Sequence, residues 1–161
     1  MGRIAREVVI NVSPETLFAF LAQPERLPDW TPGVISVRKT SSGPVGVGTT
    51  TETVVEAFGM RQTLLGRCTS FEAPKRLAVV NETAGGISVG GVSIGKVTTS
   101  SASELSPEGT GTRLRASFEY KLAAGLLTGL AESVAGPQMQ RDFDQSLVNL
   151  KQLLERPASP G

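Results

Sequence analysis

Residues 136–156, GPQMQRDFDQSLVNLKQLLER, decide the fold, because this stretch reads as one long amphipathic helix. Its apolar side chains recur at spacings of four, four, three and four residues and therefore share one face: Met139, Phe143, Leu147, Leu150 and Leu154. At about 1.5 Å per residue, such a helix is about 30 Å long. The rest of the chain has to supply an apolar surface of similar length to receive it.

The N-terminal part predicts one strand followed by two short helices. Residues 4–12 are rich in Val and Ile and end at Ser13-Pro14, a pair typical of a helix start, with Ser as the cap and Pro in the first turn. Gln23-Pro24 ends this helix, and residues 25–29 form a second short helical turn before Trp30.

The middle of the chain predicts strands separated by turns rich in Gly, Pro and Ser. The expected strands are residues 33–40, 47–57, 60–72, 76–83, 88–105 and 111–122. Short turns between consecutive strands indicate an antiparallel meander. Residues 123–135 are expected to be helical or loop-like, and Gly136-Pro137 is expected to break or kink the chain before the long helix.

The composition argues against several classes of function. Lys and Arg number 16 against 15 Asp and Glu, and no basic stripe is visible, so nucleic acid is not an expected partner. There is no His and only one Cys, Cys68, so we expect no metal and no cofactor and interpret Cys68 as a small core residue. No apolar signal segment or bilayer-length stretch is present, which favours a cytoplasmic protein without membrane insertion.

Residues 90–96, GGVSIGK, match the spacing of a phosphate-binding loop as far as Lys96. Val97 stands where such a loop needs Ser or Thr for Mg²⁺, and the residues that follow are β-branched and hydroxylated rather than helix-forming. Without a helix N-terminus there is no cradle for an anion. We interpret the glycines as marking a bulged or sharply bent strand.

Two segments resemble the opening of the START-like helix-grip superfamily (SRPBCC): VINVSPETLFAF at residues 9–20 and PERLPDWTPGV at residues 24–34. The similarity is closest to its polyketide cyclase/dehydrase-like, lipid-transport-like branch, and residues 46–49, 71–77 and 147–155 fit it in order. It implies an α+β fold, in which a curved antiparallel sheet of about seven strands (β-α-α-β6-α) wraps around the C-terminal helix. We expect one domain over residues 1–156 and a frayed tail at 157–161.

The resemblance implies a cavity between sheet and helix that holds a hydrophobic small molecule, lipid-like or aromatic/polyketide-like, in a carrier or sensor. The alternatives are a polyketide cyclase/dehydratase-type enzyme that uses the same cavity and an interaction protein with a filled core. Whether the chain is an enzyme stays open, because the sequence assigns no catalytic residue. The charged residues within the strands cannot be assigned to one face: Glu52, Glu56, Arg61, Arg67, Glu82 and Glu104. A monomer and a homodimer are both compatible with the sequence.

The candidate cavity-lining residues are large and apolar or aromatic. They are Trp30, Phe58, Met60, Leu64, Phe118, Tyr120, Leu127, Leu130, Met139 and Phe143. Tyr120 would add a hydroxyl as a polar handle for the ligand. Each residue has an alternative role: core packing for the strand and helix residues, a buried anchor for Trp30, a dimer contact for Phe58 and Met60, and an ordinary first helical turn for Leu127 and Leu130.

Overall fold

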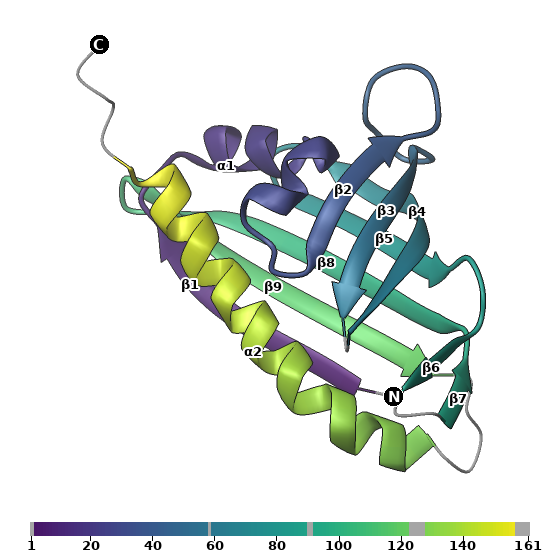
Figure 1. Cartoon of the computed structure of the whole chain (residues 1–161). Helices are drawn as coiled ribbons and strands as arrows, with labels where there is room; N and C mark the ends of the chain where they lie inside the picture. The colour runs from purple at the N-terminus through teal and green to yellow at the C-terminus, as the bar shows by residue number, and fades with distance from the viewer. Residues whose placement is uncertain (1, 58, 90–91, 123–127, 157–161) are drawn as a thin grey trace.

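A curved sheet and one long helix that lies against it make up the body of the protein (Figure 1). The computed structural model describes residues 2–57, 59–89, 92–122 and 128–156. The elements are β1 (Gly2–Ile10), α1 (Pro14–Leu21), the 3₁₀ helix η1 (Pro24–Asp29), β2 (Val34–Lys39), β3 (Thr50–Ala57), β4 (Met60–Glu72), β5 (Arg76–Thr83), β6 (Ile87–Val89), β7 (Val92–Gly95), β8 (Val97–Glu108), β9 (Gly111–Leu122) and α2 (Thr128–Leu154). The expected frayed tail at 157–161 lies outside the described residues.

The main sheet is antiparallel and has seven strands, in the order β1-β9-β8-β5-β4-β3-β2. β1 pairs with β9, so the first and last strands of the chain lie side by side at one edge of the sheet. Register shifts at Cys68/Ser70 in β4 and at Val34/Ser36 in β2 are bulges of the kind that bend a strand. This confirms the α+β helix-grip fold with a seven-stranded sheet.

The start of α1 follows from its local sequence. The hydroxyl of Ser13 accepts a hydrogen bond from the backbone N–H of Thr16 at 3.2 Å, and Pro14 stands in the first turn. Leu17, Phe18 and Phe20 are buried against the sheet. The predicted helix cap and helix start are therefore confirmed.

The expected single strand over residues 88–105 was wrong. β6 and β7 pair with each other in a separate two-stranded sheet, and β8 joins the main sheet only from Val97. Gly95 has a φ of 68°, a conformation that glycine adopts without strain and that ends β7. The backbone N–H of Val97 then donates to the hydroxyl of Thr83 at 3.1 Å, which fixes the start of β8.

Gly136-Pro137 was expected to break or kink the chain. The break was wrong, because α2 runs through both residues, and the kink stays a prediction. A proline inside a helix removes one hydrogen bond and crowds the preceding turn, but packing can offset that cost. Ala135 is 3% exposed, so this part of α2 is packed rather than free in solvent. A Cβ on Gly136 would lie 3.1 Å from the Tyr120 hydroxyl oxygen, so glycine permits a close approach of helix to sheet.

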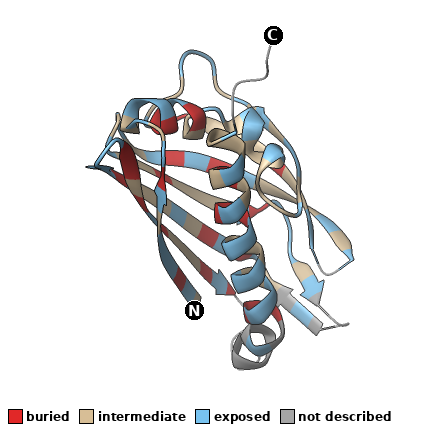
Figure 2. Cartoon of the chain, turned by 90° about the vertical axis from the view of Figure 1, so that its left-hand side faces the viewer, coloured by how far each residue is buried: buried red, intermediate tan, exposed pale blue. Residues whose placement is uncertain are grey.

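Two packed clusters occupy opposite ends of β9. The first cluster lies near the start of β9 and includes Leu114 together with Ile10, Leu17 and Leu150. The second cluster contains Tyr120 and Leu122, near the end of β9. Figure 2 shows α2 in front of the sheet with much of its outward face exposed. No helix within the described ranges is long and apolar enough to cross a membrane.

Candidate ligand cavity

A cavity of about 390 Å³ lies between the concave face of the sheet and α2. Its lining comes from the end of α1, from η1 and the loop after it, from the loop between β2 and β3, and from strands β2, β3, β4, β5, β8 and β9. α2 lies on the other side. Its larger apolar lining residues are Leu21, Leu27, Trp30, Val34, Val37, Val45, Val55, Leu64, Leu77, Val79, Leu114, Phe118, Met139, Phe143, Leu147 and Leu150. The interior of the grip is therefore mainly apolar but not filled.

The structure brings five of the ten candidate residues together in this lining. They are Trp30, Leu64, Phe118, Met139 and Phe143. The rings of Phe118 and Phe143 lie with their centroids 6.3 Å apart, so β9 and α2 meet through aromatic side chains at the cavity wall. Whether these five residues contact a ligand stays a prediction.

Trp30 both lines the cavity and packs as an anchor, the two roles that the sequence left open. Its side chain lines the cavity and also packs against the first core cluster. The side-chain amide of Asn149 on α2 donates to the backbone carbonyl of Trp30 at 3.1 Å. This bond ties the end of η1 to the helix across the end of the cavity.

Tyr120 and Met60 lie elsewhere. Tyr120 is 6% exposed and packs in the second cluster, with its ring above Gly2 and its hydroxyl facing Gly136. A Cβ on Gly2 would lie 2.1 Å from the Tyr120 ring, so the glycine leaves the space that the ring fills. Met60 pairs with Ala57 at the end of the β3–β4 hairpin and is not part of the lining. The interpretation of Tyr120 as a polar handle therefore lacks support.

The remaining candidates lie beyond what can be described. Phe58 and Leu127 lie outside the described residues. Leu130 belongs to α2, but its side chain is outside the described part of the structure. The prediction that Phe58, Leu127 and Leu130 line the cavity is therefore untested.

Sequence reasoning missed the polar part of the wall. Its uncharged members are Thr31, Thr49, Thr51, Thr53, Asn81, Thr99, Ser101, Ser103, Ser117 and Ser146. A signal for them exists in residues 49–53 and 98–103, where hydroxyl side chains occupy both faces of a strand. Since one face of this sheet is covered by α2, two hydroxylated faces imply a polar patch inside as well as outside.

The charged strand residues face away from the cavity. Glu52 pairs with Arg38 at 3.2 Å, and Glu82 pairs with Lys96 at 3.0 Å. Glu56 and Glu104 pair in the same way with Arg61 and Arg76. These are exposed contacts between neighbouring strands or across turns, and Arg67 is exposed too. The described lining contains no Lys or Arg.

The described part of the lining contains two ionisable side chains, those of Cys68 and Asp142. Burial raises the pKa of the Cys68 thiol, which donates to the carbonyl of Ser70 at 3.3 Å, so the thiol stays protonated and is a weak nucleophile. The Asp142 carboxylate accepts from the side-chain amide of Gln138 at 2.8 Å. In the described part of the chain, no three His, Cys, Asp or Glu side chains gather as a metal would require.

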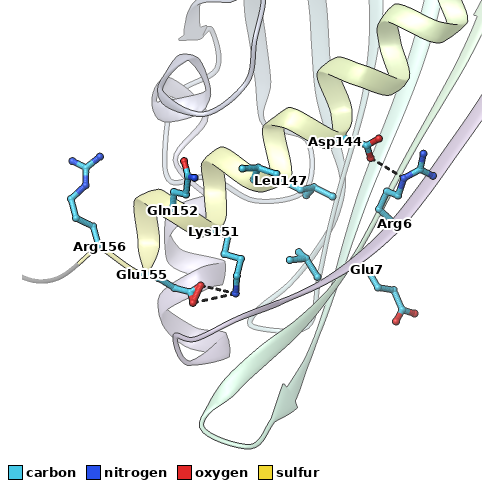
Figure 3. Close-up of a pocket in the computed structure, with 10 residues that line it drawn as sticks. Arg6, Glu7, Asp144, Leu147, Lys151, Gln152, Glu155 and Arg156 are labelled. Carbon is cyan, nitrogen blue, oxygen red and sulfur yellow. Dashed lines mark hydrogen bonds and ion pairs between the residues drawn. The ribbon is translucent and has the colours of Figure 1, made fainter.

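A second hollow, of about 700 Å³, is an open surface groove between β1 and α2 (Figure 3). Its charges neutralise one another: Arg6 pairs with Asp144 at 2.8 Å and Lys151 with Glu155 at 2.7 Å. Lys151 also donates to the backbone carbonyl of Val9 at 2.6 Å. These contacts fasten the helix to the edge strand, so we interpret the groove as a structural seam.

Comparison with solved structures shows the same fold. TTHA0849 from Thermus thermophilus has a TM-score of 0.76 at 19% identity, over 98% of this chain and 100% of that one. A conserved protein from Geobacillus kaustophilus has a TM-score of 0.72 at 11% identity, over 95% of each chain. A START superfamily protein from Mycobacterium smegmatis has a TM-score of 0.68 at 12% identity, over 96% of this chain and 97% of that one.

The family assignment comes from the sequence as a whole. No curated protein matches this chain. The family model described as polyketide cyclase / dehydrase and lipid transport matches residues 1–155. This match spans the curved sheet, the cavity and the whole of α2. The chain belongs to the polyketide cyclase / dehydrase and lipid transport family and has the START-like helix-grip fold.

Proposed function

We propose that this protein binds a hydrophobic small molecule in the cavity between sheet and α2, as a carrier or sensor. The observation that supports it best is the cavity of about 390 Å³ with a mainly apolar wall. That volume lies within the range of small-molecule sites, about 300–1,000 Å³. An interaction protein with a filled core is less compatible with such a cavity.

The alternative, a polyketide cyclase/dehydratase-type enzyme, needs acid–base or electrophilic groups that converge on a bound substrate. The described lining offers Asp142 and a protonated Cys68 but neither Arg nor Lys. The sole Tyr, Tyr120, packs against Gly2 and Gly136 instead. These placements favour binding over catalysis.

Fluorescence titration with N-phenyl-1-naphthylamine, a neutral hydrophobic dye, tests the proposal. The test variant is Ser101→Phe, because Ser101 is a small residue that lines the cavity. The matched control is Ser100→Phe, since Ser100 directly precedes Ser101 in β8 and is not part of the lining. We expect saturable binding that Ser101→Phe weakens at least about tenfold and the control leaves within about twofold. Absence of binding, or equal affinity in both variants, would contradict the proposal.

Native mass spectrometry of protein purified gently from its source would identify a co-purified ligand. Four features stay predictions: the cytoplasmic location, the absence of a nucleic-acid partner, the choice between monomer and homodimer, and the single domain over residues 1–156. Size-exclusion chromatography with light scattering would decide the oligomeric state.

A further inference from the structure

A row of polar side chains crosses the sheet at the wall of the cavity. Thr51 on β3 pairs in register with Gly66 on β4, and Gly66 pairs with Asn81 on β5. Asn81 in turn pairs with Thr99 on β8. Directly opposed residues of antiparallel strands project from the same face. Thr51, Asn81 and Thr99 all line the cavity, so this row lies on the concave face.

Gly66 lets the polar atoms of this row converge. A Cβ on Gly66 would lie 2.4 Å from Asn81 Oδ1 and 2.6 Å from Thr51 Oγ1. Both distances are far below van der Waals contact, so the two oxygens occupy the space that any other residue would fill. The missing side chain thus lets the Asn81 amide and the Thr51 hydroxyl approach each other over Gly66.

The protein itself leaves the hydrogen-bonding capacity of this row unused. Two neighbouring hydroxyls serve the fold: Thr49 accepts from the N–H of Gly46 at 2.9 Å, and Thr83 accepts from Val97. The side chains of Thr51, Asn81 and Thr99 make no hydrogen bond with any residue in the described ranges. Their polar atoms are not among the fully buried, unpartnered ones, so water can reach them from the cavity. A ligand that enters the cavity has to replace those water contacts with hydrogen bonds of its own.

The charge of the wall limits what the partner can be. A carboxylate or phosphate is normally held by Arg or Lys, and the described lining has neither. The carboxylate of Asp142, also in the lining, would repel an anion. An amide and two hydroxyls suit a neutral oxygen, because they donate to a carbonyl and both donate to and accept from a hydroxyl.

We propose that Thr51, Asn81 and Thr99 form a subsite for a neutral carbonyl or hydroxyl group on an otherwise apolar ligand. This rests on the proposed function, since it assigns a chemical class to the ligand of the same cavity. The class is ketones, alcohols and phenols, in preference to fatty acids and phospholipids.

Three naphthalenes of similar shape test the subsite by displacing N-phenyl-1-naphthylamine. They are 2-acetylnaphthalene, a ketone; 2-ethylnaphthalene, its hydrocarbon counterpart; and 2-naphthoate, an anion. We expect wild-type protein to bind the ketone about 3- to 10-fold more tightly than the hydrocarbon, the range expected for one or two neutral hydrogen bonds. The anion should bind most weakly.

Variants assign the preference to residues. Asn81→Leu and Thr99→Val should abolish or reduce the preference for ketone over hydrocarbon. Thr98→Val is the matched control, because Thr98 is exposed, neighbours Thr99 in β8 and is not part of the lining. Thermal melts check that each variant folds, and the wild-type comparison of the three probes needs no variant at all.

The possible failures are distinguishable. If the hydrocarbon binds as well as the ketone, or the anion binds best, the subsite is refuted while hydrophobic binding in the cavity stands. If Asn81→Leu weakens ketone and hydrocarbon equally, the row acts by shape alone and the assignment is wrong. If no probe and no dye binds the wild-type protein, the proposed function fails and the subsite with it.

Discussion

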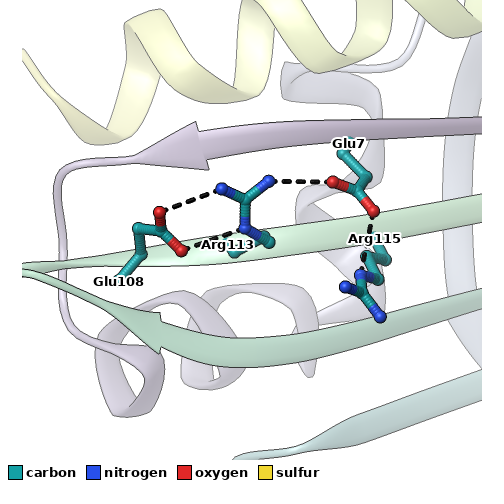
Figure 4. A network of polar contacts seen from close by, with 4 residues as sticks. All are labelled: Glu7, Glu108, Arg113 and Arg115. Atoms are coloured by element: carbon teal, nitrogen blue, oxygen red, sulfur yellow. Dashed lines mark hydrogen bonds and ion pairs between the residues drawn. The ribbon is translucent and has the colours of Figure 1, made fainter.

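Arg113 shows how single residues on the outer face of the sheet are used. Its guanidinium donates to Glu108 at 2.9 Å and to Glu7 at 2.8 Å, while Arg115 pairs with the other oxygen of Glu7 at 2.9 Å (Figure 4). Hydrogen bonds from Arg113 lower the pKa of the Glu108 carboxyl. In turn, the carboxylates of Glu108 and Glu7 raise the pKa of Arg113. This network ties β1, β8 and β9 together on the side away from the cavity.

The Glu108 contact predicts a pH-dependent contribution to stability. The pKa of the Glu108 carboxyl is lower in the folded than in the unfolded protein. Such a group contributes its full stabilisation of the folded state at pH values above its unfolded pKa, and loses it as the pH falls through its folded pKa. Glu108→Gln should therefore lower the melting temperature slightly at pH 7. The difference from wild type should shrink and vanish in acid, because wild-type Glu108 is then protonated as well.

Melting curves from pH 7 down to about pH 3, a span that brackets ordinary carboxyl pKa values, measure this difference. Glu72→Gln is the control, because Glu72 is exposed and forms no ion pair with the residues that the structure describes. A difference for Glu108→Gln that is constant across this range would show that Arg113 contributes nothing through charge.

At the scale of elements, α2 depends on tertiary contacts more than on its local sequence. Pro137 interrupts its hydrogen bonding, and Gly136 is a poor helix former. The helix nevertheless continues, fastened near its C-terminal end by Lys151 to Val9 and by Asn149 to Trp30. These contacts on the C-terminal side of Pro137, together with the burial of Ala135 just before it, therefore override the local signal.

This interpretation predicts that Pro137→Ala stabilises the protein. Proline costs up to about 3 kcal/mol in a helix interior relative to alanine, and Pro137 is exposed, so alanine removes no packing. We expect the free energy of unfolding to rise by about 1–3 kcal/mol in urea denaturation. Gly136→Val is the contrasting neighbour and should destabilise, because its side chain would press on the Tyr120 hydroxyl. Destabilisation by Pro137→Ala would mean that the proline is needed to shape the helix.

At the scale of the whole molecule, the apolar interior is divided into two packed clusters, and the cavity lies between them. The first cluster contains Leu114 and Leu150, and the second contains Tyr120 and Leu122. Phe118, between them on β9, faces the cavity. A bound ligand would contact residues next to both clusters and so link the two ends of the grip.

Ligand binding should accordingly raise the melting temperature. A ligand that binds only the folded state stabilises it by about 2.7 kcal/mol at 100 times its Kd. For a chain of this size, that corresponds to a rise of roughly 5–10 °C. Differential scanning calorimetry with 2-acetylnaphthalene measures the shift, and Ser101→Phe should show little or none. A similar rise in that variant would place the binding outside the cavity.

Local sequence patterns determined most of the elements and the fold class. The spacing of Leu147, Leu150 and Leu154 predicted the C-terminal helix, and Ser13-Pro14 predicted where the first helix begins. These signals act over a few residues, through side-chain periodicity and satisfied backbone groups. The same local logic failed at Pro137 and Gly95, where a distant contact or a positive φ decided the outcome.

The sequence by itself therefore determined an α+β helix-grip chain with an apolar helix face and a curved sheet to receive it. Only the tertiary structure decided what lines the hollow between them. It placed Tyr120 in a packed cluster and set Thr51, Asn81 and Thr99 around Gly66. The physical reason is register: a strand offers two faces, and which one is enclosed depends on how β1 joins β9 and where α2 lies.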